Sequence, residues 1–367
     1  MDFSFFLPTR FYFGEGCLKA NFHPLEELGR RALIVTGRRS ARESGALEDL
    51  LEVLEHLKIK WSIFERVPPN PTLEVLAEGV KVAQEERVDL VIGCGGGSPM
   101  DVAKGIAILA TNKVKATELY RTPLPEAPLP VVAIPTTAGT GSEVTPHAVF
   151  TLPEEETKKG FSDVRLFPRV AWVDPRYTYS LPEEVTIDTA LDALSHAVEG
   201  YLSRRASPLT DLLATEVIRL IGSCRNALEK REFTPHIRRS LLYASSLAGM
   251  VIAQTRTTIL HTLGYSLTFF RGVPHGRANG LLMAAYLEFL APVAPQKVAH
   301  ILSLLGFSGI DELGVTLKNL LPSPERYTDE ELKGYAALAS KAQHSLKATL
   351  RSAREDELYE ILRRSLL

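Results

Sequence analysis

The fold is decided by one stretch, Val88-Asp-Leu-Val-Ile-Gly-Cys-Gly-Gly-Gly-Ser-Pro-Met-Asp-Val-Ala-Lys104. An apolar β-rich run opens it, and a helical pattern runs from Pro99 to about Thr111. The consecutive glycines between them let the backbone approach a ligand without a Cβ. Ser98 is expected to cap the helix with Pro99 in its first position, and such a helix start suits an anion such as pyrophosphate. A tight turn packed on the sheet is the alternative, because the spacing is neither GxGxxG nor a Walker loop.

Strand-like and helix-like segments alternate throughout the first half of the chain, on both sides of this turn. Strands are predicted at residues 32–36, 61–64, 88–93 and 130–135, with helices at 44–57, 72–86 and 99–111. Alternating strands and helices indicate βαβ units with right-handed crossovers and a mostly parallel sheet. Beyond Leu181 helical patterns dominate, at residues 185–202, 209–230, 237–254, 280–290 and 329–366. We therefore expect an α/β nucleotide-binding domain at 1–180 and an all-helical domain at 181–367, with a ligand site in the cleft between them.

Length, charge and cysteine content agree with a soluble enzyme. The 367 residues exceed what one core usually supports, and the 42 Lys and Arg against 44 Asp and Glu give a net charge of −2. Such a balance creates no basic field for nucleic acid. The 3 cysteines form no CxxC motif, which favours a reducing compartment over a disulfide or thiolate-zinc scaffold. No apolar run reaches the roughly 20 residues that span a bilayer, and the N-terminus lacks a signal-peptide pattern, so we expect a cytoplasmic protein.

A second segment rich in small residues follows the next strand: Pro135-Thr-Thr-Ala-Gly-Thr-Gly-Ser-Glu-Val-Thr145. It lies at the carboxyl end of a buried strand, which is where open α/β sheets bind ligands. Hydroxyl groups beside a phosphate-type turn favour contact with the ligand over a solvated loop.

A candidate metal site begins in the helical half. Asp192 and His196 are four residues apart, so they share one helix face. His261 and His275 follow, and one carboxylate with three imidazoles would complete a first shell for Fe, Zn, Ni or Cu. The spacing alone leaves open whether the four converge. Surface or hydrogen-bonded roles are favoured for the other histidines, which are His23, His56, His147, His236, His300 and His344.

Together these segments resemble the iron-containing (group III) alcohol dehydrogenase family. The resemblance covers nearly the whole chain and is carried by Phe13-Gly14, Pro69-Asn70-Pro71, Gly95-Gly-Gly-Ser-Pro-Met-Asp101, Pro135 to Glu143, Asp192-Ala-Leu-Ser-His196 and Pro274-His-Gly276. It implies an N-terminal Rossmann-like α/β domain and an all-α C-terminal domain, in the dehydroquinate synthase-like architecture.

The resemblance also implies the site residues and the chemistry. A divalent metal, Fe²⁺ or alternatively Zn²⁺, would be held by Asp192, His196, His261 and His275. Acting as a Lewis acid, it would assist reversible hydride transfer between a small alcohol or diol and NADP or NAD. The implied nucleotide contacts are Asn70, Gly96, Gly97, Ser98, Asp101, Thr136, Thr137, Thr140, Val149, Lys158, Tyr177 and Leu181.

The chain departs from the family pattern at two places. Many members carry a histidine four residues after the third ligand, where this chain has Tyr265; that phenol is a candidate for a substrate contact or for a structural role. NAD-preferring relatives often have an acidic residue after the first strand, whereas this chain has Gly37, Arg38, Arg39 and Ser40. Arginines in place of a carboxylate favour a 2′-phosphate, so NADP is expected over NAD.

The leading hypothesis is a metal-dependent, NADP-preferring alcohol dehydrogenase or aldehyde reductase that forms a homodimer. The alternatives are a dehydroquinate synthase-type lyase, a glycerol dehydrogenase-like polyol oxidoreductase, a metallohydrolase and a non-catalytic sensor. A lyase of that type needs a lysine and arginine cluster at the metal, but only Arg256, Arg271 and Arg277 are near the expected ligands in sequence. A hydrolase would leave the glycine turn without a role.

Overall fold

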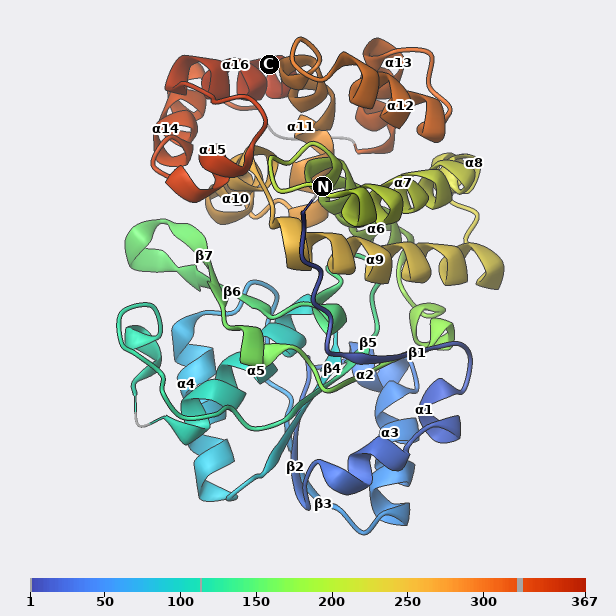
Figure 1. The fold of residues 1–367 in the computed structure, drawn as a ribbon, viewed down its shortest axis with the longest axis vertical. Coiled ribbons are helices and arrows are strands. Elements are labelled where there is room, and N and C mark those ends of the chain that lie inside the picture. Colours follow the sequence, from blue (N-terminus) through green and yellow to red (C-terminus); the bar gives the residue numbers. More distant parts are fainter. Residues whose placement is uncertain (1, 113, 322–325) are drawn as a thin grey trace. The chain divides into compact units, whose positions relative to one another are not determined.

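The computed structural model describes residues 2–112, 114–321 and 326–367. The chain forms two compact units, an α/β unit over Phe6–Pro182 and a helical unit over Glu183–Leu367 that also includes the segment preceding Phe6 (Figure 1). The predicted fold class is confirmed, with a parallel sheet in the first unit and helices in the second.

The α/β unit is built on a six-stranded sheet in its described residues, with the order β1-β8-β5-β4-β2-β3 and every neighbouring pair parallel. The strands are β1 (Arg10–Phe13), β2 (Arg31–Val35), β3 (Lys60–Phe64), β4 (Leu90–Gly95), β5 (Val131–Pro135) and β8 (Val170–Val173). Because all run the same way, the loops after β2, β4 and β5 leave the same edge of the sheet. An antiparallel pair, β6 (His147–Leu152) and β7 (Thr157–Ser162), follows the second small-residue loop.

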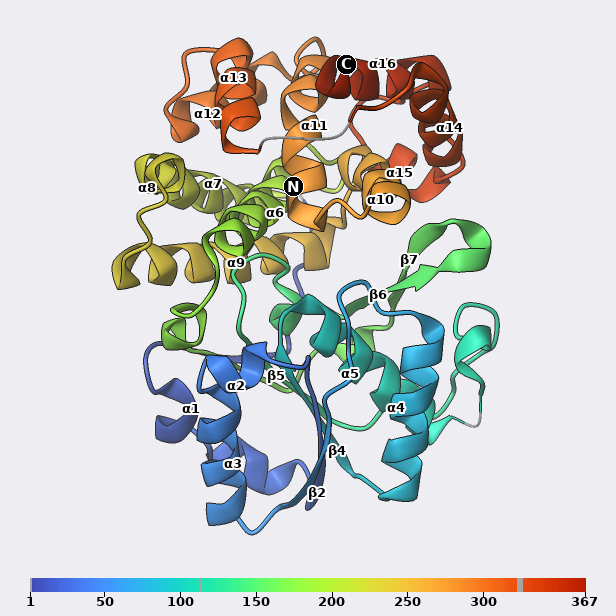
Figure 2. The same ribbon diagram turned by 180° about the vertical axis from the view of Figure 1, so that it is seen from behind.

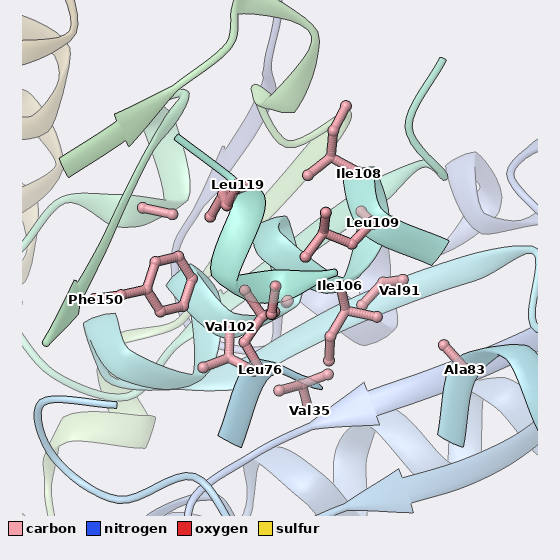
Figure 3. Close-up of a cluster of buried hydrophobic side chains, with 14 of the residues drawn as sticks. Val35, Leu76, Ala83, Val91, Val102, Ile106, Ile108, Leu109, Leu119 and Phe150 are labelled. Carbon is pink, nitrogen blue, oxygen red and sulfur yellow. The ribbon is translucent and has the colours of Figure 1, made fainter. Parts of the chain in front are cut away.

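Helices cover both faces of this sheet. α1 (Cys17–Ala20) and α3 (Ala46–His56) pack with Ala32 and Ile34 on one face. On the other face, α4 (Leu73–Glu85) and α5 (Gly97–Thr111) pack with Leu33 and Val35 (Figure 3). Burial on both faces explains why the inner strands β2, β4, β5 and β8 have nearly continuous apolar sequences. The short helix α2 (Ser40–Glu43) follows β2.

The helical unit is organised around α6 (Glu183–Tyr201), which packs against α7 (Pro208–Ser223), α9 (Pro235–Thr255) and α11 (His275–Leu290) (Figure 2). The remaining helices are α8 (Arg225–Lys230), α10 (Ile259–Arg271), α12 (Pro295–Leu305), α13 (Ile310–Leu320), α14 (Asp329–Ala339), α15 (Gln343–Ala348) and α16 (Glu355–Leu366). Within the described part of this unit, strand pairing is limited to an isolated bridge between Ser203 and Thr349.

Several predicted boundaries were wrong. The helix predicted at 209–230 is broken at Cys224 into α7 and α8, and the one predicted at 329–366 is three helices, α14 to α16. The bridge from Thr349 to Ser203 interrupts the second pattern where α15 ends. Helices α10, α12 and α13 were missed by the prediction.

None of the described helices is by itself both long and apolar enough to cross a bilayer. The consecutive helices α12 and α13, bent by 49° at their junction, meet the length and composition requirement only as a pair.

Candidate metal centre and nucleotide site

Three imidazoles surround one carboxylate oxygen in the helical unit. The Oδ1 atom of Asp192 lies 3.7 Å from Nε2 of His261, 3.7 Å from Nε2 of His275 and 3.9 Å from Nε2 of His196. The donor atoms of Asp192, His261 and His275 all lie within 4.8 Å of one another. The His196 ring stacks on that of His261, with centroids 4.7 Å apart. The structure therefore brings together all four predicted metal ligands.

Three helices supply these side chains. Asp192 and His196 are one turn apart on α6, His261 lies in the first turn of α10, and His275 begins α11. The start of α11 lies directly on α6: a Cβ on Gly276 would be 1.8 Å from the carbonyl oxygen of Asp188. Only glycine permits this approach, which sets the position of the His275 backbone.

The centre is buried and strongly charged. Asp192, His196 and His261 are all buried, whereas His275 is partly exposed. Burial opposes ionisation of Asp192, but the neighbouring histidines outweigh it and hold the pKa of Asp192 well below its usual range. Burial also opposes protonation of His261, but the carboxylates of Glu199 and Asp192 prevail and raise the pKa of His261 to about 9.

The donor set suits a divalent transition metal. Imidazole nitrogens with one carboxylate favour Fe or Zn over Mg or Ca, which prefer shells of oxygen. Bonds of about 2.1 Å in a tetrahedral shell place donors roughly 3.4 Å apart. The observed separations of 3.7–3.9 Å from Asp192 Oδ1 are only slightly wider, so the residues fit such an ion.

A layer of buried polar groups lies behind the imidazoles. Glu199, also on α6, contacts Nδ1 of His261 and accepts hydrogen bonds from Thr258. The amide nitrogen of Asn279 lies 3.2 Å from both Asp192 Oδ1 and His261 Nε2. Sequence reasoning missed these residues, although Glu199 stands seven positions after Asp192 and so lies on the same helix face.

Tyr265 packs against the metal centre. Its ring stacks on that of His275, with centroids 5.4 Å apart and planes 25° apart, and meets the His261 ring edge-on at 6.5 Å. The phenol ring therefore restricts the orientation of one candidate ligand.

The glycine turn in the α/β unit differs from the prediction in one detail. Helix α5 begins at Gly97 with Gly96 as its N-cap, so the prediction that Ser98 caps the helix was wrong. The glycines allow the helix to start earlier: Gly95 has φ +151°, and a Cβ on Gly97 would lie 2.7 Å from Cγ2 of Thr140. The two small-residue loops are consequently in close contact.

A buried lysine and aspartate connect α5 to the second loop. Lys104 donates to the carbonyl oxygens of Ser142 and His147 and to the Ser142 hydroxyl, at 2.7–2.8 Å. Asp101 accepts from Ser142 Oγ at 2.8 Å and from the Val149 amide at 3.0 Å. Burial raises the pKa of Asp101 and lowers that of Lys104 to about 8. The Asp101 carboxylate thus holds the loop in place, and Lys104 was not foreseen.

Most of the other predicted nucleotide residues lie around this turn. Lys158 donates to the Asn70 side chain at 3.0 Å, and the amide of Thr136 donates to the Gly95 carbonyl at 2.9 Å. Thr137 lies next to Gly96, where a Cβ would be 3.3 Å from its hydroxyl. Residues 37–40 follow β2, so they leave the same sheet edge as the turn.

Tyr177 has different surroundings. Its side chain is buried in the core on the α3 face, and its hydroxyl donates to Asp49 at 2.9 Å. The Leu181 amide donates to the Thr178 carbonyl. The structure therefore does not bring the Tyr177 side chain to the glycine turn.

Comparison with known proteins agrees with this geometry. Residues 8–175 match the family model described as iron-containing alcohol dehydrogenase, and residues 186–366 match that of the Fe-containing alcohol dehydrogenase family, C-terminal. The chain belongs to the iron-containing alcohol dehydrogenase family. It is 35% identical over 314 residues to 1,3-propanediol dehydrogenase of Klebsiella pneumoniae, covering 83% of this chain and 79% of that one.

Solved structures of iron-containing alcohol dehydrogenases have the same fold. That of an iron-containing alcohol dehydrogenase from Thermotoga maritima superposes with a TM-score of 0.92 at 39% identity, covering 100% of this chain and 99% of that one. Other relatives include an NAD-dependent methanol dehydrogenase of Bacillus methanolicus and an NADPH-dependent butanol dehydrogenase of Clostridium saccharobutylicum, each 31% identical over 96% and 86% of this chain. The chain is thus a metal-dependent, NAD(P)-linked alcohol dehydrogenase, as the resemblance implied.

Substitution of Gly276 should disrupt the metal centre. The Gly276→Ala variant places a methyl group 2.9 Å from Asp192 Cβ and against backbone, which must move α11 and His275. We expect metal affinity, measured by chelator competition, to fall at least about tenfold, the equivalent of about 1.4 kcal/mol. Gly334→Ala, at an exposed helical position with open space around it, is the control and should stabilise by about 0.5–1 kcal/mol. Unchanged metal binding in Gly276→Ala would contradict this account of α11.

Removal of the buried ammonium should destabilise the α/β unit. In Lys104→Met the carbonyls of Ser142 and His147 lose their hydrogen-bond donor. The Asp101 carboxylate loses its positive neighbour. We expect the free energy of unfolding, measured by urea denaturation, to fall by about 3–5 kcal/mol. Lys81→Met, at an exposed position on α4, should change it by less than about 0.5 kcal/mol. Equal effects of the two variants would refute the role assigned to Lys104.

Proposed function

We propose that this enzyme interconverts small alcohols or diols and their aldehydes or ketones, with NADP as the preferred cofactor and with Asp192, His196, His261 and His275 holding Fe²⁺ or Zn²⁺. The observation that carries the proposal is the set of three imidazole Nε2 atoms within 3.9 Å of Asp192 Oδ1. A glycine-rich turn and the hydroxyl-rich loop in contact with it, both in the α/β unit, support nucleotide binding.

The protein's own residues would bind and orient the reactants. A metal ion at the four ligands would supply Lewis acidity to polarise a substrate carbonyl, and the nicotinamide would carry the hydride. Asp192 stays ionised at neutral pH because the histidines lower its pKa, so it offers negative charge to the cation. The Tyr265 ring holds the His275 imidazole by stacking, and we assign this tyrosine a positioning role.

Two of the three arginines that are near the ligands in sequence, Arg271 and Arg277, do not support the lyase alternative. Arg277 is paired with Asp188 and Glu184, each at 2.9 Å, and Arg271 donates to the Arg326 carbonyl at 2.7 Å. Groups engaged in this way are poorly placed to receive a phosphorylated sugar acid. A glycerol dehydrogenase-like polyol oxidoreductase uses the same hydride chemistry, so a substrate panel separates it from a dehydrogenase of simple alcohols.

The preference for NADP rests on the loop after β2. Arg38 and Arg39 are exposed there, and the Arg39 guanidinium lies 3.9 Å from the Glu43 carboxylate. Two exposed guanidinium groups and Ser40 would offer charge-assisted hydrogen bonds to a 2′-phosphate. The homodimer, which the resemblance implies, and the cytoplasmic location, which the composition implies, belong to the same proposal.

Metal removal should abolish aldehyde reduction reversibly. Chelation should lower NADPH oxidation with butanal by about a thousandfold, because a Lewis acid contributes several kcal/mol to the transition state. Reloading with Fe²⁺ or Zn²⁺ should restore it. His261→Ala should abolish restoration, whereas His236→Ala, at an exposed position, should not. Full activity of the chelated enzyme, or no turnover across an aldehyde and ketone panel with either nucleotide, would refute the proposal.

A negative charge at the start of the loop that follows β2 should shift the cofactor preference from NADPH towards NADH. A Cβ on Gly37 lies 3.5 Å or more from its neighbours, so Gly37→Asp can be accommodated. We expect the ratio of kcat/KM for NADH over NADPH to rise at least about tenfold, since a carboxylate repels the 2′-phosphate. Gly309→Asp adds the same charge at the N-cap of α13 and should leave the ratio unchanged. An unaltered ratio in Gly37→Asp would mean that the ribose binds elsewhere.

A further inference from the structure

Glu199 is a fully buried carboxylate without a role in the chemistry proposed above. It lies on α6, and its Oε1 atom accepts from the Thr258 amide at 2.9 Å, the Thr258 hydroxyl at 2.6 Å and the His261 amide at 3.3 Å. Its Oε2 atom contacts Nδ1 of His261. A buried carboxylate needs such compensation, since burial of an unpaired charge costs several kcal/mol.

This contact determines which nitrogen of His261 carries hydrogen. An ionised carboxylate can only accept, so Nδ1 must be the donor. A neutral imidazole then has its lone pair on Nε2, the atom that lies 3.7 Å from Asp192 Oδ1. A metal binds this lone pair and cannot bind a protonated nitrogen.

Thr258, which is itself in contact with Tyr286, holds the Glu199 carboxylate in place. The Thr258 hydroxyl that donates to Glu199 also lies 2.9 Å from the Tyr286 hydroxyl, and both side chains are buried. Thr258 is the N-cap residue of α10, the helix that carries His261. The Glu199 carboxylate therefore fixes both the backbone and the imidazole ring of His261.

We propose that Glu199 is a positioning residue that keeps His261 in its Nδ1–H tautomer, with Nε2 directed at the metal. The inference rests on the proposed metal site and adds to it a residue that does not touch the ion. Outer carboxylates of this kind typically contribute about 10–100-fold to metal affinity.

Glu199→Gln is the direct test because it keeps the shape and reverses one hydrogen bond. If Oε1 goes on accepting from Thr258, the amide nitrogen faces His261 Nδ1 and donates to it, which moves the imidazole hydrogen to Nε2. We expect the Zn²⁺ dissociation constant, from competition with a chromogenic chelator, to rise about 10–100-fold. The dissociation constant of NADPH should change little, and the metal-free variant should remain folded, as its circular dichroism spectrum would show, although with a lower melting temperature because His261 loses a buried partner.

Two controls separate this role from bulk charge and from folding. Glu216→Gln removes one carboxylate from an exposed ion pair on α7 and should leave Zn²⁺ affinity within about twofold. In ¹⁵N NMR spectra of the Zn²⁺-loaded wild type, the His261 ring should carry hydrogen on Nδ1 only. Glu199→Asp retains the charge and should recover part of the affinity.

The outcomes distinguish this inference from the proposed function. Wild-type Zn²⁺ affinity in a folded Glu199→Gln variant, or a Zn²⁺-loaded wild type without hydrogen on His261 Nδ1, would overturn the role of Glu199 alone. If Asp192→Asn also left Zn²⁺ affinity unchanged, the metal assignment itself would fail.

Discussion

The burial of the Asp192 charge is the constraint on which the helical unit depends. Removal of an ionised carboxylate from water costs several kcal/mol, and this cost is recovered only by close, well-oriented partners. Here the partners are imidazoles from α6, α10 and α11, so the three helices must meet at one point. Gly276 allows α11 to reach α6 closely enough for this.

The α/β unit also buries a charge that needs close partners, but this charge is positive. Lys104 is fully buried, and its ammonium takes its acceptors from the loop that follows β5. Because Asp101 on the same helix binds Ser142 as well, a single turn of α5 fixes the hydroxyl-rich loop beside the glycine turn. The net charge of −2 therefore does not indicate the local charge at either site, since each buried charge is compensated by groups within a few ångströms.

Much of this could be predicted from the sequence, and the gaps have physical causes. Strands β2, β4 and β5 were found because burial on both faces leaves continuous apolar runs, whereas β3 is a partly exposed edge strand that was found from its aromatic and β-branched residues. Helix α10 was missed although its partly exposed residues Thr262, Tyr265 and Phe269 lie at helical spacing. Asp192 and His196 were paired because helix geometry is local, whereas the approach of His261 and His275 depends on how α10 and α11 pack. Ser98 was predicted as the cap because serine is a preferred N-cap residue and Pro99 suits the first helical position, whereas the flexible glycines let α5 begin at Gly97 with Gly96 as its N-cap.

The two sites should differ in how freely they tolerate substitution. Arg38 and Arg39 are exposed, so their replacement leaves no buried group unpaired and costs the fold little. Each member of the metal centre is connected through hydrogen bonds or ring contacts to others, as Glu199 is to His261 and Thr258. A change there leaves a buried charge without compensation.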